Sequence, residues 1–87
     1  MKAYRIGVHI IAADFMDDAK AFFLDEVGEP LPSLIEELDW LAEVPCEDGT
    51  TATIKSIVNR TLDERNAWLR MGIPCDLYCP FIVARLP

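Results

Sequence analysis

The chain has 87 residues, 52% of them hydrophobic, and a formal net charge of −7 at pH 7. This length predicts a single domain, and the hydrophobic content excludes an intrinsically disordered chain. The negative charge argues against direct nucleic-acid binding, which needs a basic surface, and no apolar run reaches the ~18 residues of a membrane span. We therefore expect one globular domain over residues 1–87, with no membrane and no direct nucleic-acid contact.

The first eleven residues alternate between apolar and polar side chains, which predicts a half-buried strand over residues 2–11. One face of that strand would carry Tyr4, Ile6, Val8 and Ile10. A base followed by apolar residues also begins secretion signals, but Arg5 and His9 interrupt the run and no small-residue cleavage site is clear. We therefore expect a protein of the cytoplasm of the producing or host cell.

Residues 14–27 predict an amphipathic helix with apolar side chains at spacings of three and four. Its apolar stripe consists of Phe15, Met16, Ala19, Phe22, Phe23 and Val27. Asp14 is the expected N-cap, and Gly28 stands where a left-handed C-cap would end the helix. Asp25 lies near the C-terminal end, where the helix dipole disfavours it, which indicates a use other than helix stability.

A second helix is expected over residues 33–44, after the proline-rich break at residues 28–32. Ser33 and Glu36 have the spacing of a capping box, and Pro45 ends the pattern. The predicted buried arc contains Leu34, Ile35, Leu38, Leu41 and Ala42. The predicted exposed line, at spacings of three and four, contains Glu36, Asp39 and Glu43.

Trp40 falls outside the apolar arc of that helix, among carboxylates. An exposed Trp there would be an interface anchor, because Trp is enriched among binding hot spots. Alternatively, its ring packs against the loop at residues 45–49. Trp68, by contrast, belongs to an apolar arc and is expected in the core.

Residues 50–71 have two interpretations. A single long helix capped by Thr50 or Thr51 places the apolar residues within one arc of about 140°. The alternative is a hairpin at Asp48-Gly49 followed by a strand and a shorter helix, which gives the ferredoxin-like order β-α-β-β-α-β. The single helix covers more of the pattern and is favoured.

A closing strand is expected over residues 76–87, with Pro80 at an edge or a bulge. The predicted fold class is therefore α+β: a small sheet formed by the N- and C-terminal strands, with about three helices packed on it in the order β-α-α-α-β. The ferredoxin-like order remains the alternative.

Three cysteines, Cys46, Cys75 and Cys79, suggest reduced thiols, because their number is odd and no secretion signal is present. Cys75, Cys79 and His9 lack the closely spaced ligand pairs typical of zinc sites. No phosphate-binding glycine loop and no Ser/His/Asp arrangement is present. We therefore predict no catalytic residue, no metal and no cofactor, and a non-enzymatic protein.

The charge is unevenly distributed along the chain. Residues 12–49 contain twelve acids and one base, a net charge of 1 − 12 = −11, whereas the remaining residues carry seven bases and three acids, or 7 − 3 = +4. Helical carboxylates three or four residues apart stand ~6 Å apart, close to the spacing of phosphates along a DNA strand. Such a surface can occupy a basic groove built for nucleic acid.

In size, charge and expected architecture, the chain resembles small acidic phage-encoded inhibitors of the anti-CRISPR type. It also resembles small acidic immunity proteins and barstar-type nuclease inhibitors. The resemblance implies binding to the basic surface of a CRISPR effector or nuclease, as a DNA mimic, by a monomer or homodimer. The residues expected to bind the partner are Asp14, Asp17, Asp18, Asp25, Glu36, Glu37, Asp39, Trp40 and Glu43.

Two other hypotheses remain open. The first is a ferredoxin-like domain that binds a small molecule or serves as an enzyme subunit, with a pocket near Arg5, His9 or Cys79. The second is an acidic surface that serves only solubility, on a protein that self-associates through its exposed sheet edge.

Overall fold

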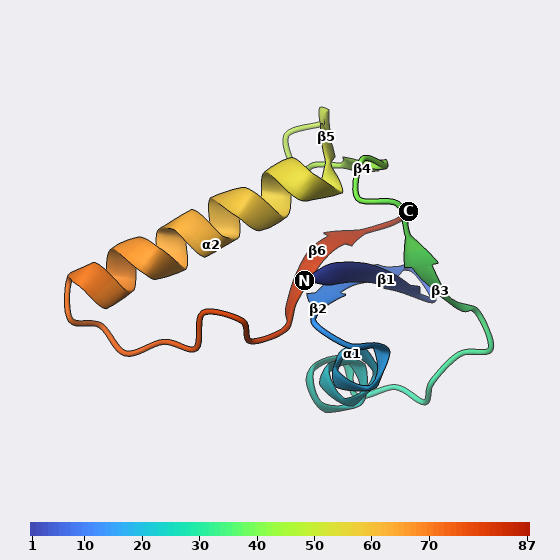
Figure 1. Cartoon of the computed structure of the whole chain (residues 1–87). Coiled ribbons are helices and arrows are strands. Elements are labelled where there is room, and N and C mark those ends of the chain that lie inside the picture. Colours follow the sequence, from blue (N-terminus) through green and yellow to red (C-terminus); the bar gives the residue numbers. More distant parts are fainter.

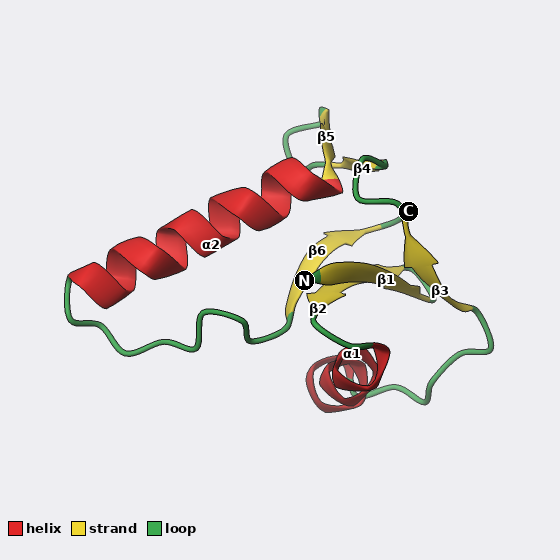
Figure 2. Ribbon diagram, in the orientation of Figure 1, coloured by secondary structure: helices red, strands yellow, loops and turns green.

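A computed structural model describes all residues, 1–87, and has the α+β class predicted from the sequence (Figures 1 and 2). The main sheet has four antiparallel strands in the order β3-β1-β2-β6: β3 (Ile35–Leu38), β1 (Lys2–Ile6), β2 (His9–Ala13) and β6 (Phe81–Arg85). A separate hairpin consists of β4 (Glu43–Pro45) and β5 (Thr51–Thr53). The helical elements are α1 (Met16–Phe22), its π-helical continuation η1 (Phe23–Val27), and α2 (Ile54–Arg70).

The expected single strand over residues 2–11 is wrong, because the chain reverses at Gly7 and Val8. Gly7 has φ +62°, which a glycine adopts easily at the first position of a two-residue hairpin turn. Ile6 consequently pairs with His9, and β1 and β2 form a tight hairpin. The alternation of apolar and polar residues continues across Gly7 and Val8, so the sequence pattern gave no sign of the turn.

The two faces of the sheet are covered by different layers, as Figure 1 shows. On one face Tyr4, Ile6, Ile11 and Ala13 pack against Ala19 and Phe23 of the α1 layer. On the other face Ala3, Ile10, Ala12 and Ala84 pack against Val44 of β4 and against Ile54, Ile57 and Val58 of α2. Each strand of the β1–β2 hairpin thus buries both of its faces.

The first predicted helix is confirmed in place, but its ends differ in detail. Phe15, and not Asp14, is the N-cap residue, and it makes no side-chain capping bond. The C-terminal part over residues 23–27 is π-helical, and Gly28 ends it in the left-handed conformation, as predicted, with φ 73°.

The predicted helix over residues 33–44 is wrong. Residues 35–38 form β3 and pair with β1, and residues 43–45 form β4 and pair with β5. Ladder hydrogen bonds to strands distant in sequence here override the local helical pattern and the capping box. The molecule therefore has two helices where about three were expected.

Residues 50–71 combine both interpretations. The turn at residues 46–50 joins β4 and β5, as the hairpin interpretation expected, and its Asp48 carboxylate accepts hydrogen bonds from the amide and hydroxyl of Thr50. The single-helix interpretation is confirmed for residues 54–70, but the helix begins later than expected. Its N-cap is Thr53, whose hydroxyl accepts a hydrogen bond from the Ser56 amide at 3.2 Å.

The C-terminal half of α2 extends beyond the sheet (Figure 1), which leaves part of its apolar arc uncovered. Trp68 is 45% exposed, so its predicted place in the core is wrong. The accessible surface of 5597 Å² exceeds the ~5,200 Å² expected for a compact monomer of this mass. The radius of gyration, 13.1 Å, likewise exceeds the ~12 Å expected for 87 residues.

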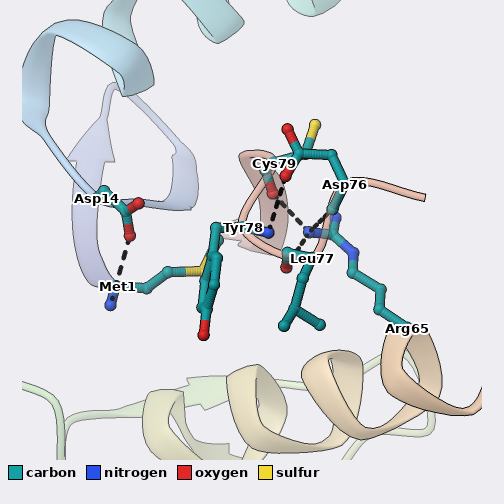
Figure 3. Close-up of polar contacts among 7 residues, drawn as sticks. All are labelled: Met1, Asp14, Arg65, Asp76, Leu77, Tyr78 and Cys79. Atoms are coloured by element: carbon teal, nitrogen blue, oxygen red, sulfur yellow. Dashed lines mark hydrogen bonds and ion pairs between the residues drawn. The ribbon is translucent and has the colours of Figure 1, made fainter. Parts of the chain in front are cut away.

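The side chain of Arg65 on α2 holds the segment that connects α2 to β6 (Figure 3). Its guanidinium donates to the carbonyl oxygens of Leu77 at 3.0 Å and Cys79 at 2.7 Å, with a longer contact to that of Asp76 at 3.4 Å. The same guanidinium lies 4.9 Å from the centre of the Phe81 ring. The predicted closing strand is confirmed over the shorter range Phe81–Arg85.

Candidate functional site

The acidic side chains of the α1 layer project away from the sheet. Ala19 and Phe23 are buried against the strands, so the opposite side of the helix faces solvent. Asp17, Asp18 and Asp25 are exposed on that side. Asp18 and Asp25 are seven residues apart, about two turns, and line one shallow depression together with Pro80. The structure therefore brings Asp18 and Asp25 together, and Asp17 is exposed on the same helix.

Glu37 lies on the same side of the sheet, and Asp14 lies in the connection between β2 and α1. Glu37 is the register partner of Tyr4 and shares its face, and Asp14 follows directly after β2. Each makes one ion pair: Glu37 with the Lys2 ammonium at 3.4 Å, and Asp14 with the Met1 amino group at 3.7 Å (Figure 3). Together with the helix they form what we call the α1-side acidic surface: Asp14, Asp17, Asp18, Asp25 and Glu37.

The pKa of Tyr4 is shifted by its burial and by the charges around it. The residue is 3% exposed, and burial of the phenol raises its pKa. The Lys2 ammonium opposes that shift. The carboxylates of Glu37, Asp14 and Asp18 add to the shift.

The remaining predicted residues lie elsewhere, because no helix spans residues 33–44. Glu36 is opposite Arg5 in the register and faces the α2 side of the sheet. Asp39 lies in the loop after β3, where its carboxylate accepts a hydrogen bond from the Leu41 amide at 2.7 Å. Glu43 is exposed on β4, in the layer that covers the α2 side. The expected continuous line of Glu36, Asp39 and Glu43 is therefore wrong.

Trp40 is half-buried and packs against the core cluster of the α2 side. Its carbonyl oxygen accepts the Lys55 amide at 3.0 Å, which ties the loop to the first turn of α2. Trp40 is therefore neither the exposed anchor nor a ring packed only on the loop at residues 45–49, because its partner is the core cluster.

Few of the carboxylates are neutralised inside the protein. The chain has 15 Asp and Glu residues, and only two of them form ion pairs, those with Met1 and Lys2. No arginine pairs with any of them. Asp14 and Glu37 of the α1-side acidic surface are the two that are paired, and the carboxylates of Asp17, Asp18 and Asp25 make no ion pair within the protein.

A groove of about 840 Å³ lies on the other side of the molecule. Its walls are strand β6, the turn of the β4–β5 hairpin and the first half of α2. Ile57, Ala52 and Val83 contribute apolar surface, and Arg60 and Arg85 contribute positive charge. Sequence reasoning missed both arginines as site residues, because only the fold brings positions 60 and 85 together.

The groove is not the pocket expected near Arg5, His9 or Cys79. Arg5 uses its Nε to donate to the Gly7 carbonyl oxygen at 3.0 Å. His9 packs edge-on against Phe23, with ring centres 5.7 Å apart. Cys79 is exposed and Cys46 and Cys75 are half-buried, all as free thiols. No group of three or more His, Cys, Asp or Glu side chains has an arrangement that could hold a metal ion.

Comparisons of this chain with protein-family models, with curated proteins and with solved structures found no match. None of its helices has the length and hydropathy needed to cross a membrane.

Proposed function

We propose that this protein is a non-enzymatic inhibitor that binds the basic surface of a nucleic-acid-handling effector, a CRISPR-type complex or a nuclease. Its α1-side acidic surface would occupy the channel that otherwise receives DNA. The observation that carries the proposal is the set of exposed carboxylates on α1 and η1 that no internal cation neutralises.

The arrangement suits a surface that competes with a polyanion. Asp17, Asp18 and Asp25 are held on a helix whose other side is packed, so their backbone positions are fixed before binding. Preorganised charges cost less conformational entropy on association than charges on a mobile tail. Long-range attraction to a cationic channel would also speed the encounter, and added salt would slow it.

The test compares two variants with the same change in charge. Asp17→Asn, Asp18→Asn and Asp25→Asn remove three charges from the α1-side acidic surface. The matched control removes three from the other positions: Glu36→Gln, Asp39→Asn and Glu43→Gln. Both variants have a net charge of −7 + 3 = −4.

Inhibition of DNA cleavage is measured across a panel of CRISPR effector complexes and nucleases, with binding kinetics at several salt concentrations for any effector that the parent inhibits. The first variant should lose about tenfold or more in association rate, and the control should stay within about threefold. Circular dichroism checks that both remain folded. Equal losses in both variants would show that net charge, and not this surface, is responsible. An absence of inhibition by the parent across the panel would contradict the proposal itself.

A further inference from the structure

The groove of about 840 Å³ runs along the outer edge of β6. Four consecutive residues of that strand, 82–85, line it. Side chains of consecutive strand residues point to opposite faces, so a cavity that touches all four follows the edge of the strand and not one face. The volume lies within the ~300–1,000 Å³ range of ligand sites.

The backbone along this edge is unpaired. β6 is the last strand of the sheet and pairs only with β2. The Leu86 amide donates to the carbonyl oxygen of Val8, the residue opposite it. Hydrogen-bonded and non-hydrogen-bonded pairs alternate along an antiparallel ladder, so Arg85, opposite His9, directs its own amide and carbonyl away from β2.

Two arginine side chains in the groove, Arg60 and Arg85, indicate what kind of ligand it would bind. Neither Arg60 nor Arg85 forms an ion pair, although the chain has an excess of carboxylates. Two acids also line the groove: Glu47 makes no ion pair, and Asp48 accepts hydrogen bonds from Thr50, which are the main cause of its lowered pKa, with a smaller contribution from Arg60. Two unpaired guanidinium groups beside an open strand edge favour a carboxylate on the incoming chain.

We propose that this groove binds an extended, carboxylate-bearing peptide segment of a partner protein as a fifth strand beside β6, with the carboxylate held by Arg60 and Arg85. Main-chain hydrogen bonds to the outward groups of β6 supply affinity, and the apolar surface of Ile57 and Val83 receives side chains of the peptide. Ile82, 44% exposed on the other face of β6, offers a second contact.

A second copy of this chain fits the edge less well. The register with β2 shifts between Ile10 and Ile11, so β6 has an extra residue there, at Val83. Such a bulge bends an edge strand and hinders pairing with another long, flat edge. The turn of the hairpin forms the opposite wall of the groove.

The test uses a library of random heptapeptides displayed on phage, selected on the intact protein. A heptapeptide is long enough to span the five residues of β6. Enriched peptides are synthesised and titrated into isotope-labelled protein, with amide exchange measured by NMR. Affinities are compared for Arg60→Ala, Arg85→Ala and, as the matched control outside the groove, Arg70→Ala.

Enriched peptides should carry an acidic residue or depend on a free C-terminus. At ten times the dissociation constant, exchange of the Arg85 amide should slow about tenfold. Arg60→Ala and Arg85→Ala should each weaken binding about tenfold, as should replacement of the peptide carboxylate by an amide, and Arg70→Ala should leave affinity unchanged. The proposal is overturned if no peptide is enriched, if the perturbed amides lie outside the groove, or if Arg85 is protected by concentration-dependent dimerisation instead.

Discussion

Replacement of Arg65 by alanine should destabilise the protein more than any other loss of a single surface charge. The guanidinium Nη1 donates to the carbonyl oxygens of Leu77 and Cys79, and its carbon lies over the Phe81 ring. These contacts join α2 to the segment that leads into β6. Without them, the residues between α2 and the sheet lose most of their attachment.

The magnitude follows from those contacts. Nη1 has two N–H groups, so the two short bonds use both and the 3.4 Å contact to Asp76 adds little. Bonds to charged groups contribute ~1.5–3 kcal/mol when shielded, and the exposure of this site reduces each to ~1 kcal/mol. The contact with the ring adds ~0.5 kcal/mol. Arg65→Ala should therefore cost about 2 to 3 kcal/mol, which lowers the melting temperature by ~10–20 °C in a domain of this size.

Urea and thermal denaturation followed by circular dichroism measure the effect. Arg65→Lys keeps the charge but lacks the planar fork, so it should recover less than half of the loss. Arg70→Ala, at the exposed end of α2, should cost less than ~1 kcal/mol, mainly through the helix dipole. If Arg65→Lys is as stable as the parent, charge alone accounts for the role of Arg65 and the reasoning from hydrogen-bond geometry is wrong.

Two other predictions concern the helix cap and the buried phenol. Thr53→Ala should cost ~1 kcal/mol in urea denaturation and Thr53→Ser much less, because the capping hydroxyl accepts from the Ser56 amide; equal losses would exclude the cap. The raised pKa of Tyr4 means that the folded state holds its phenolic proton more tightly than the unfolded chain. This contribution is complete below the unfolded pKa of ~10 and is lost as pH rises through the folded value. Tyr4→Phe should reduce the fall in stability above pH ~10, as measured by denaturation at several pH values.

The elements that could be predicted are those specified by local sequence. The periodic spacing over residues 54–70 predicts α2 because a helix is built from contacts three and four residues apart. Gly28 was predicted as a C-cap because glycine readily adopts the left-handed conformation that ends a helix, which is also a local property. The start of α2 was misplaced because Thr50, Thr51 and Thr53 can all cap a helix, and only the hairpin with β4 decides between them.

The elements that could not be predicted depend on distant partners. Strand β3 has four residues, and its apolar residues Ile35 and Leu38 face opposite sides of the sheet. That spacing of three equally fits a helix, and a capping box precedes it. Pairing with the distant strand β1 determines the outcome, because Ile35 pairs with Ile6 and Leu38 with Ala3, and a single sequence contains no direct signal for that pairing.

The same limit applies to the acidic residues. Composition shows how many carboxylates lie between residues 12 and 49 but not which face each one occupies. Glu36 and Glu37 are adjacent in the sequence, yet β3 directs them to opposite sides of the sheet. The single acidic surface expected from composition is therefore two groups of carboxylates, one on the α1 side of the sheet and one on the α2 side.

That division gives the molecule two surfaces of unlike charge. Residues 14–29 carry six acids and one base, a net charge of 1 − 6 = −5, whereas residues 54–85 carry five bases and three acids, or 5 − 3 = +2. The sheet lies between α1 and α2 (Figure 2), so the carboxylates on α1 and the Arg60 guanidinium on α2 belong to layers on opposite sides of it. The basic partner proposed for the α1 side and the carboxylate-bearing peptide proposed beside β6 would therefore use different residues of the chain and need not compete.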